Sequence, residues 1–528
     1  MDLIRRLPQK PLIALSIFLV VLALYLFTLA PSITQRHFGA DSAELVATGH
    51  TLGVAHPTGY PTYLLLAKAF SLIIPWGGVA HRINVLSAIS GAGAVVLVYF
   101  TCRLFIERTF GDSEATSFRA SAAAIIAAAS FAFSPLLWSQ SVIAEVYSLN
   151  ALFTGSVMLL VLRWFTSHGK GFWPLFTAAL LMGIGLGNHL TLIFIALPVA
   201  YIMVLNRREL TSGTIIKFLG IFFLGISVYI YLPLRASENP QINWGDATTL
   251  EGFLWTVSAT PYRGLAFGLP LADLPGRLVE WADVLVKQFN ALGLFIGILG
   301  VWRLRISGLP LLVFSTLLFL PSIVFSIMYR SSGAPVYLIP AFMVLALWIG
   351  VGFYWLMNLA RDSAPLRLKL LVPLPSTLFF VVLLVVPGLN LLLNYEGVSL
   401  RGDNESLIYA QAIFQAVEPN AVILADTDQE LFSLWYYSLV EKGGRGPTVV
   451  STRLTQFDWY LRGQHKRYTE VIPAEITGAY DNRLIQIVEF NLEMRPVYIT
   501  TGADFLLTHF DGGREGDLYR LLSRKSRQ

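Results

Sequence analysis

Residues 12–30 read LIALSIFLVVLALYLFTLA, and the segment that follows contains His37-Phe-Gly-Ala-Asp41-Ser-Ala-Glu44. The apolar run is long enough to cross a bilayer, which takes about 20 such residues. Ionisable groups are costly to keep beside a membrane and usually serve a function there. The stretch therefore predicts a membrane-spanning helix followed by a functional loop.

The composition extends this prediction to the whole chain. Of its 528 residues, 55% are hydrophobic and 13% are charged, whereas soluble domains average about 25% charged residues. Ten more apolar runs follow the first, at residues 83–106, 117–133, 146–165, 172–187, 190–205, 214–233, 278–302, 309–328, 335–357 and 374–393. We expect an α-helical polytopic membrane protein with about 11 transmembrane helices. The two runs divided at Asn188 and His189 are alternatively a re-entrant hairpin.

The basic residues predict the orientation of these helices. Alternate connections hold 16 of the 24 Lys and Arg residues that precede residue 394, which is the positive-inside asymmetry. They are Arg5, Arg6, Lys10, Arg103, Arg108, Arg119, Arg163, Lys170, Arg207, Arg208, Lys217, Arg303, Arg305, Arg361, Arg367 and Lys369. The first run, a signal anchor or a signal peptide, then starts in the cytoplasm. The first outer loop spans residues 31–82 and the second spans residues 234–277 of a membrane domain covering residues 1–394.

Residues 395–528 have the composition of a soluble domain. Short apolar segments at residues 421–424, 448–451 and 497–500 alternate with amphipathic stretches, which is typical of a small α/β domain. Parity places this domain outside the cell. The net charge of +5 arises in the membrane part, so the basic balance indicates topology and not a nucleic-acid partner. The single cysteine, Cys102, lies among apolar residues and excludes an internal disulfide.

Asp41 and Glu44 allow two interpretations. Their spacing of three residues places both carboxylates on one face of a helix. The same Asp-Ser-Ala-Glu sequence is also a capping box, in which Asp41 caps the helix and Glu44 reaches back to it. The spacing alone favours the cap, and the two interpretations are compatible because a cap also fixes a carboxylate in space.

Four groups of residues resemble the motifs of a known family. They are Asp41 with Glu44, His56-Pro57-Thr-Gly59-Tyr60-Pro61, Arg82-Ile-Asn84 and Glu145-Val-Tyr147. Together they resemble multi-span glycosyltransferases of the GT-C class, and in particular bacterial relatives of the protein O-mannosyltransferases, in the branch that includes the animal plexin-type enzyme. The resemblance covers residues 41 to 246, with Ala43 where relatives commonly carry glycine. It does not extend to the C-terminal domain.

The resemblance implies a GT-C-like fold and an activity. The protein would sit in the cell (plasma or inner) membrane and take a sugar from a polyprenyl-phosphate-linked donor. It would transfer that sugar to a hydroxyl of an acceptor protein or cell-envelope glycan on the outer face. Its partners would be this donor, the acceptor and the lipid bilayer, with no nucleic acid. No cofactor is expected, no metal ligand is assigned, and a divalent ion is not excluded.

Such a transfer needs a base for the acceptor hydroxyl, because an alcohol is a poor nucleophile until its proton is accepted. Asp41 is the expected base, and Glu44 is its alternate or orients the acceptor. One base and no covalent intermediate predict inversion at the sugar. The second outer loop, which contains Trp244, is expected to cap the site.

Other residues are candidates for binding the donor. Arg82, Arg235, Arg330 and Arg263 are candidates for the phosphate, since a guanidinium binds phosphate through paired hydrogen bonds; each is alternatively an interfacial arginine. The remaining candidates for substrate binding are His56, Tyr60, Asn84, Glu145, Tyr147, Asn188 and His189. Each histidine is alternatively a structural residue whose hydrogen bonds are satisfied within the fold. Glu145 could instead pair with Arg82.

Two other classes of function compete with this one. A transporter or flippase for lipid-linked sugars would carry paired charges within its spans and inverted repeats, neither of which the sequence displays. A non-catalytic scaffold for envelope assembly would be unaffected by loss of Asp41.

Overall fold

The structure is a computed structural model of the chain, and it describes every residue except 1–8, 112–113, 168–170, 364–373 and 526–528. Five basic residues used in the topology prediction, namely Arg5, Arg6, Lys170, Arg367 and Lys369, lie outside the described residues, as do the side chains of Lys10 and Arg361.

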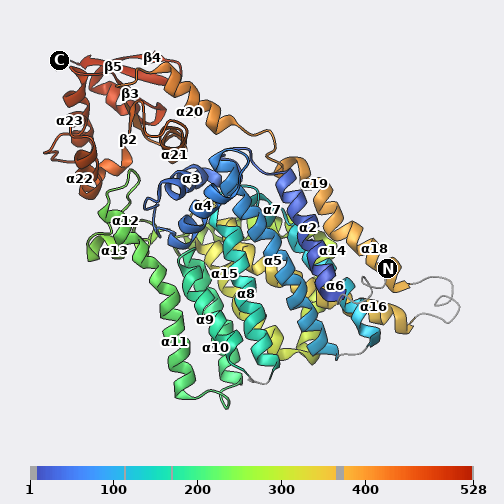
Figure 1. The fold of residues 1–528 in the computed structure, drawn as a ribbon. Coiled ribbons are helices and arrows are strands. Elements are labelled where there is room, and N and C mark those ends of the chain that lie inside the picture. Colours follow the sequence, from blue (N-terminus) through green and yellow to red (C-terminus); the bar gives the residue numbers. More distant parts are fainter. Residues whose placement is uncertain (1–8, 112–113, 168–170, 364–373, 526–528) are drawn as a thin grey trace.

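A body of helices forms most of the molecule (Figure 1). All eleven predicted apolar runs lie mainly within helices in their described residues. The helices that contain these runs are α2 (Gln9–Phe27), α5 (Val79–Phe110), α6 (Glu114–Ala132), α8 (Val146–Thr166), α9 (Trp173–Leu186), η2 (Leu190–Ile195) with α10 (Ala196–Leu205), α11 (Ser212–Ile226) with η3 (Ser227–Ile230) and α12 (Tyr231–Ser237), α14 (Leu274–Ser307), α15 (Leu309–Met328), η6 (Ala334–Leu338) with α16 (Ile339–Ser363), and α18 (Leu374–Leu383) with η7 (Leu384–Gly388) and α19 (Leu389–Val398).

Length and composition mark the chain as a multi-pass membrane protein. Seven helical segments of the described chain are long and apolar enough to cross a bilayer. Four of the predicted runs, at α2, α6, α9 and η2 with α10, form shorter apolar helices. A tilted or locally thinned bilayer accommodates short helices, so the helices are compatible with the predicted count without fixing it.

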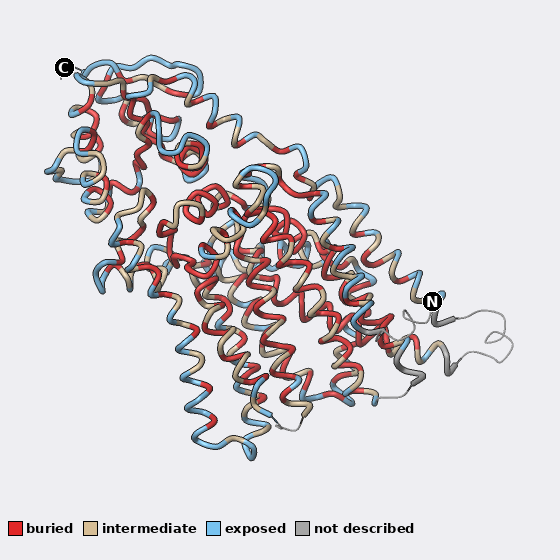
Figure 2. Tube along the Cα trace, in the orientation of Figure 1, coloured by how far each residue is buried: buried red, intermediate tan, exposed pale blue. Residues whose placement is uncertain are grey.

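The helix α16 lies at the centre of the body. Within its apolar window 94% of the residues are buried, against 22% to 33% for the peripheral segments that contain α11, α14, α15 and α19. Figure 2 shows the same gradient, with buried residues inside and exposed residues on the outer helices. Many of these exposed residues are apolar, such as Phe223 and Leu224 of α11. Helices that are hydrophobic all round yet exposed are those that face lipid.

Glycines bring α14 and α16 into backbone contact. A Cβ atom on Gly300 would lie 1.9 Å from the carbonyl oxygen of Trp348, and one on Gly352 would lie 2.0 Å from that of Ile296. Lipid tails are as apolar as leucine, so membrane helices associate through close packing of small residues rather than through the hydrophobic effect. These glycines therefore set the separation of the two helices.

The two long loops lie at one end of the helical body (Figure 1). The first contains η1 (Gly39–Asp41), α3 (Ser42–Thr51) and α4 (Pro61–Ile73), and the second contains α13 (Leu250–Val257), η4 (Thr260–Tyr262) and η5 (Leu271–Asp273). At the opposite end Arg108 donates a hydrogen bond to the carbonyl of Thr166, and Arg303 lies 4.8 Å from the ring centre of Phe110. The loops and these basic residues thus occupy opposite ends.

The chain after α19 forms an α/β unit. Its strands β1 (Val422–Ala425), β2 (Thr448–Ser451), β3 (Val497–Ile499), β4 (Phe510–Glu515) and β5 (Leu518–Arg524) form one sheet in the order β2-β1-β3-β5-β4. The first three strands are parallel, and β5 and β4 extend the sheet antiparallel. Helices α20 (Glu405–Ala416), α21 (Asp428–Tyr436), α22 (Asp458–Arg467) and α23 (Tyr480–Leu492) accompany it. The three predicted strands are confirmed, and the β4–β5 hairpin was not predicted.

The α/β unit docks onto both long loops. The side chain of Gln35 donates to the carbonyl of Gln429 in α21 at 3.1 Å. On the second loop, Trp244 and Trp255 pack against Trp459 of α22 with ring centres 6.4 and 5.5 Å apart. The C-terminal unit therefore covers the end of the body at which the loops gather.

Candidate active site

The first loop places Asp41 and Glu44 at the start of α3. Asp41 occupies the N-cap position with helical backbone angles, and its side chain makes no capping hydrogen bond. The carboxylate of Glu44 does not reach back to Asp41. It accepts a hydrogen bond from the backbone N–H of His56 at 2.9 Å and a second from the His56 ring. The capping-box interpretation is therefore wrong, because His56 competes for the oxygens of Glu44.

His56 joins the two carboxylates. Its Nδ1 contacts Oε2 of Glu44, and its Nε2 lies 3.6 Å from Oδ2 of Asp41. The hydroxyl of Tyr60 lies 3.0 Å from Nε2 and donates to the carbonyl of Pro57 at 3.3 Å. A doubly protonated His56 satisfies this whole pattern, donating from Nδ1 to Glu44 and from Nε2 to Tyr60.

The charges of the cluster support that protonation state. Burial alone would lower the pKa of His56, but the carboxylates of Glu44 and Asp41 raise it to about 10. The surrounding protein removes water from Asp41 and so raises its pKa, with His56 opposing the rise and Glu44 adding to it, although part of the side chain stays exposed. The cluster thus holds a cationic imidazole beside a carboxyl whose pKa is moved toward neutral pH.

The two carboxylates differ in accessibility. The Asp41 side chain keeps 41% of its surface exposed, whereas the Glu44 side chain is completely buried. A base must come within hydrogen-bond distance of the proton it removes. In this geometry only Asp41 can meet a substrate, and Glu44 fixes the ring of His56.

The turn from His56 to Pro61 holds this arrangement. Gly59 has φ = 83°, a left-handed backbone conformation that side chains disfavour. A Cβ atom there would also lie 2.8 Å from a methyl group of Leu232 in α12. Pro61 then opens α4 at the first helical positions, where a missing N–H costs nothing.

The second loop closes over the first, as expected. Val54 and Asn243 form a parallel β-bridge, with the N–H of Val54 donating to Ile242 at 2.9 Å. This pairing places Trp244 with its ring 6.2 Å from that of His56. Tyr262, further along the same loop, lies at the same distance from His56.

A cavity of about 270 Å³ adjoins the cluster. Tyr60, His189 and Tyr262 line its inner part, and Tyr329, Tyr337 and Arg263 also contribute to its wall. Ile193, Phe194 and Phe325, which belong to η2 and α15, line it as well. Ile193 is half exposed on the outside of the helical body. Tyr60, whose hydroxyl lies 3.0 Å from His56, thus joins the cluster to a cavity that extends to the apolar outer surface.

Three other predicted residues lie next to one another beside Tyr60, and one of them, His189, lines the cavity. His189 stacks on Tyr60 with ring centres 6.3 Å apart, and Tyr147 packs against His189 at 5.3 Å. Nδ1 of His189 bonds Thr191, and burial together with the charge of His56 lowers the pKa of His189 to about 4. The ring is thus neutral at physiological pH. Asn188 donates to the carbonyl of Val146 at 3.0 Å and fixes the turn before His189.

Glu145 is buried just before α8, and its backbone contacts Ser87. Among the described residues its Oε1 atom has no hydrogen-bond partner. Burial raises its pKa well above the usual value, and the charge of Asp41 adds to the rise. The alternative pairing with Arg82 is not found, because Arg82 donates to the carbonyls of Gly77 and Ser71 instead.

The predicted phosphate ligands lie in different places. Arg235 donates to the carbonyl of Leu52 at 2.7 Å and closes the end of α3. Arg330 is exposed beside Tyr329, and its backbone N–H donates to Leu265. Of the four arginines only Arg263 lines the cavity. Asn84 donates to the carbonyls of Ala30 and Ser32 and anchors the start of the first loop.

Sequence reasoning missed several residues of the site. Tyr262, Tyr329 and Tyr337 gave no motif, although aromatic residues clustered at the ends of predicted spans were a usable signal. Asp428 comes from the C-terminal unit. Desolvation raises its pKa, the charge of Asp41 adds to the rise and that of His56 opposes it, so Asp428 lies within electrostatic range of the cluster. Among the described residues, no three His, Cys, Asp or Glu side chains are grouped to hold a metal ion.

Part of the chain is similar to known protein O-mannosyl-transferases. Residues 41–212 match the family model described as the protein O-mannosyl-transferase TMEM260 N-terminal domain. Protein O-mannosyl-transferase tmem260 of Dictyostelium discoideum is 25% identical over 93% of this chain and 63% of its own length. Protein O-mannosyl-transferase TMEM260 of Mus musculus is 35% identical over 46% of this chain and 33% of its own length. The chain thus spans less than two thirds of either relative.

A solved structure shares the overall fold. The structure of ArnT from Cupriavidus metallidurans bound to undecaprenyl phosphate covers 97% of both chains with a TM-score of 0.57 at 13% identity. This likeness confirms the GT-C fold, including the small C-terminal sheet domain. Residues 41–212, which carry Asp41, Glu44, His56 and Glu145, are therefore the part of the chain that is similar to the protein O-mannosyl-transferase TMEM260 N-terminal domain.

Proposed function

We propose that this protein is a membrane glycosyltransferase that moves a sugar from a polyprenyl-phosphate-linked donor to a hydroxyl group, with Asp41 as the base. The observation that carries the proposal is the Glu44–His56–Asp41 cluster, in which one carboxylate is sealed by His56 and the other opens to the site. The named relatives are protein O-mannosyl-transferases, and the ArnT structure contains undecaprenyl phosphate. Both support this class of reaction.

The reaction needs one displacement. Asp41 accepts the proton of the acceptor hydroxyl while the oxygen attacks the anomeric carbon of the donor sugar. The bond from that carbon to the phosphate oxygen breaks, and the lipid phosphate leaves with the electron pair. A single displacement inverts the anomeric carbon. The pKa of Asp41, raised by burial, suits a base working near neutral pH because a stronger base accepts the proton more readily.

The cavity is the proposed donor site. Its Ile193 and Phe194 side chains lie where a polyprenyl chain in the membrane could meet them. Arg263 lines the same cavity, and a guanidinium remains charged and binds phosphate through paired hydrogen bonds. The phosphate roles of Arg82, Arg235 and Arg330 remain predictions. Arg82 and Arg235 donate to loop carbonyls outside the cavity, whereas Arg263 donates to Ser258, which itself lines the cavity.

The donor sugar, the acceptor and the membrane orientation are further parts of the proposal. Mannose is the first donor sugar to test, because both named relatives are O-mannosyl-transferases. A serine or threonine peptide is the first acceptor to test, with a cell-envelope glycan as the second. We propose that the loops and the C-terminal unit lie outside the cytoplasm in the cell membrane, in agreement with the 16 of 24 basic residues on the other side.

The test compares Asp41→Asn with Glu44→Gln. Purified full-length protein is mixed with polyprenyl-phosphate mannose and a serine/threonine peptide, and transfer is followed by mass spectrometry. Asp41→Asn should lose on the order of a hundred- to ten-thousandfold in rate, the usual contribution of a general base. It should also keep its thermal stability, because the Asp41 side chain makes no capping hydrogen bond in the structure.

Glu44→Gln serves as the control, because Gln can keep the hydrogen bond from the backbone of His56 but not the charge. It should lose both stability and activity, since it weakens the ion pair that fixes His56. Full activity of Asp41→Asn with this donor would refute its role as the base. A scaffold or flippase would show no transfer from wild-type protein with any lipid-linked sugar.

A further inference from the structure

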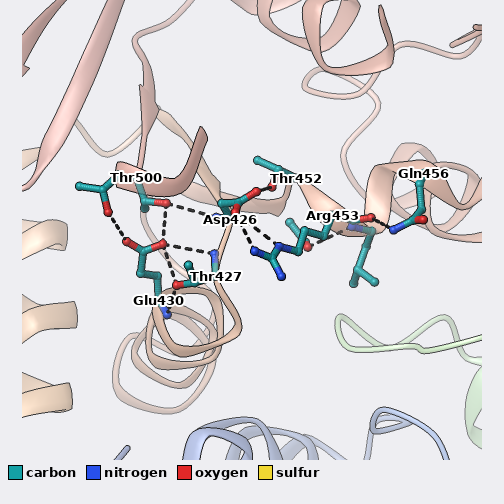
Figure 3. Close-up of polar contacts among 10 residues, drawn as sticks. Asp426, Thr427, Glu430, Thr452, Arg453, Gln456 and Thr500 are labelled. Carbon is teal, nitrogen blue, oxygen red and sulfur yellow. Dashed lines mark hydrogen bonds and ion pairs between the residues drawn. The ribbon is translucent and has the colours of Figure 1, made fainter. Parts of the chain in front are cut away.

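The C-terminal unit gathers polar residues at one edge of its sheet. Asp426, Thr452 and Thr500 each follow directly after one of the parallel strands β1, β2 and β3. The hydroxyl of Thr452 donates to Oδ1 of Asp426 at 2.6 Å, and the N–H of Asp426 donates to the hydroxyl of Thr500 at 3.2 Å (Figure 3). Ligands of open α/β sheets bind beyond the carboxyl ends of such strands, where successive connections leave in opposite directions.

The strand order makes β1 such a switch point. The chain passes from β1 through α21 to β2 on one side, and later enters β3 on the other side of β1. The segments that follow β1 and β3 therefore leave the sheet in different directions. Asp426 and Thr500 stand at these two ends, so the edge has the geometry of a ligand crevice.

A cavity of about 430 Å³ lies at this edge. It is lined by Asp426, Arg453, Gln456, Tyr480, Gly502 and Phe505. A Cβ atom on Gly502 would lie 2.7 Å from both Cβ and Oδ2 of Asp426. Glycine at this position thus lets the start of η10 (Thr501–Thr508) pack closely against Asp426.

The charges of the cavity balance. Oδ2 of Asp426 accepts a hydrogen bond from Nη2 of Arg453 at 3.1 Å. The Arg453 side chain is 57% exposed while that of Asp426 is 12% exposed, so the guanidinium keeps other N–H donors open to the cavity. Glu430 takes no part, because it accepts hydrogen bonds from Thr427, Thr500 and Thr501 in closing the N-terminus of α21.

Two aromatic rings complete the wall. The rings of Tyr480 and Phe505 lie 6.1 Å apart at an angle of 36°. Neighbouring rings offer an apolar platform, and the adjacent Asp426, Arg453 and Gln456 offer acceptors and donors. A sugar ring has matching features, with apolar C–H faces and a rim of hydroxyl groups. An anion would have to approach the carboxylate of Asp426.

We propose that this cavity is a second binding site, which takes a neutral carbohydrate. It is separate from the cavity beside the Asp41 cluster, because the two cavities share no lining residue. The C-terminal unit that carries it docks onto the first loop through the hydrogen bond from Gln35 to Gln429. A glycan held at the sheet edge would therefore lie near the active-site end of the molecule without occupying it.

The test is direct binding to the full-length protein in lipid nanodiscs. The probes are mannotriose, maltotriose, chitotriose and inorganic phosphate, at concentrations up to about 20 mM. Their binding is measured by ligand-observed NMR. This method detects millimolar dissociation constants, which correspond to a binding free energy of about 4 kcal/mol. At least one trisaccharide should bind wild-type protein. Arg453→Gln and Phe505→Ala should each weaken that binding about tenfold or more, as expected for loss of a charged hydrogen bond or a ring contact.

Matched controls lie on the same domain. Arg514→Gln changes an exposed arginine of β4, and Phe490→Ala changes a partly exposed ring of α23. Both should bind like wild type, and thermal unfolding should show that all four variants are folded. The proposal is overturned if no trisaccharide binds, if phosphate alone binds, or if binding persists in both cavity variants. Binding lost only in Asp41→Asn would also overturn it, since that places the sugar in the other site.

Discussion

Glu44 and His56 form the buried centre on which the site depends. Glu44 is completely buried, and a buried carboxylate is tolerated only when it is paired and hydrogen-bonded. The ring and the backbone of His56 meet both requirements. Removing one partner of such a pair leaves the other charge without compensation. The positioning of Asp41 therefore rests on an ion pair that no substrate touches.

This pair makes stability depend on pH in a defined direction. The pKa of His56 is raised from 6.5 to about 10 on folding, so its stabilising contribution is complete below pH 6.5 and is lost as pH rises toward 10. The stability difference between wild type and His56→Gln should thus shrink over this interval. Thermal unfolding of the purified proteins at several pH values measures it.

His189→Gln is the control for this experiment. The pKa of His189 is lowered to about 4. The contribution of its ring to the free energy of unfolding therefore rises between pH 4 and 6.5 and is constant above that interval. Its difference from wild type should stay flat from pH 6.5 to 10. Equal slopes for the two variants would contradict the assignment of a cationic His56.

The sequence predicted Asp41, Glu44 and His56 as members of one site but not their contacts. Spacing of three residues fits a capping box and a pair on one helix face equally well. The contact that decides between them joins Glu44 to a residue 12 positions away, through a turn whose path depends on Gly59 and on Leu232 of α12. Local patterns cannot supply such a long-range constraint.

Arg263 provides a second prediction about single residues. Arg263→Gln should weaken binding of a polyprenyl-phosphate sugar about ten- to a hundredfold, because loss of a charged hydrogen bond to phosphate is worth about 1.5–3 kcal/mol. Fluorescence titration with a labelled donor lipid measures the affinity. Arg82→Gln is matched in chemistry but lies outside the cavity, and it should bind the donor more tightly than Arg263→Gln. Tighter donor binding by Arg263→Gln than by Arg82→Gln would instead assign the phosphate contact to Arg82.

Helices were the most predictable elements, because apolar composition and length determine membrane helices almost by themselves. Which helix would be central was not predictable. The apolar runs of α14 and α16 look alike, and their contact depends on glycines at matching heights in both helices. The β4–β5 hairpin was missed because Asp511-Gly512-Gly513-Arg514-Glu515 resembles a turn and has no alternating apolar pattern.

The glycine contact between α14 and α16 can be tested. Gly300→Ala should destabilise the protein by about 1–3 kcal/mol, because the added methyl group would overlap the carbonyl of Trp348 and force the helices apart. Thermal unfolding in one detergent reports the change. Gly220→Ala in α11 is the matched control, since a Cβ atom there meets nothing within 4 Å. A Gly300→Ala variant as stable as Gly220→Ala would show that the close contact is not required.

The whole molecule brings together three parts of the chain that are remote in sequence. The first loop supplies Asp41, the second supplies Trp244, and α21 of the C-terminal unit supplies Asp428. Composition predicted that residues 395–528 form a separate α/β domain, but not where it docks. The docking depends on a few contacts such as Gln35 with Gln429 and Trp255 with Trp459, which no periodicity reveals.

The docking of the C-terminal unit leads to a prediction about membrane topology. The C-terminal unit covers the loop end of the body, and the turn between α10 and α11 lies at the other end (Figure 1). The experiment places single cysteines at Gly513 and Ser212, both of which are exposed. The background is a protein in which the buried Cys102 is replaced by alanine. A membrane-impermeant maleimide added to intact cells should label Gly513→Cys from outside and should label Ser212→Cys only after lysis. The basic residues of the α10–α11 turn favour a cytoplasmic position for that end, which is the orientation that we propose. Labelling of both positions in intact cells would contradict the helix arrangement, and labelling of Ser212→Cys alone would invert the proposed orientation and place Asp41 on the cytoplasmic side.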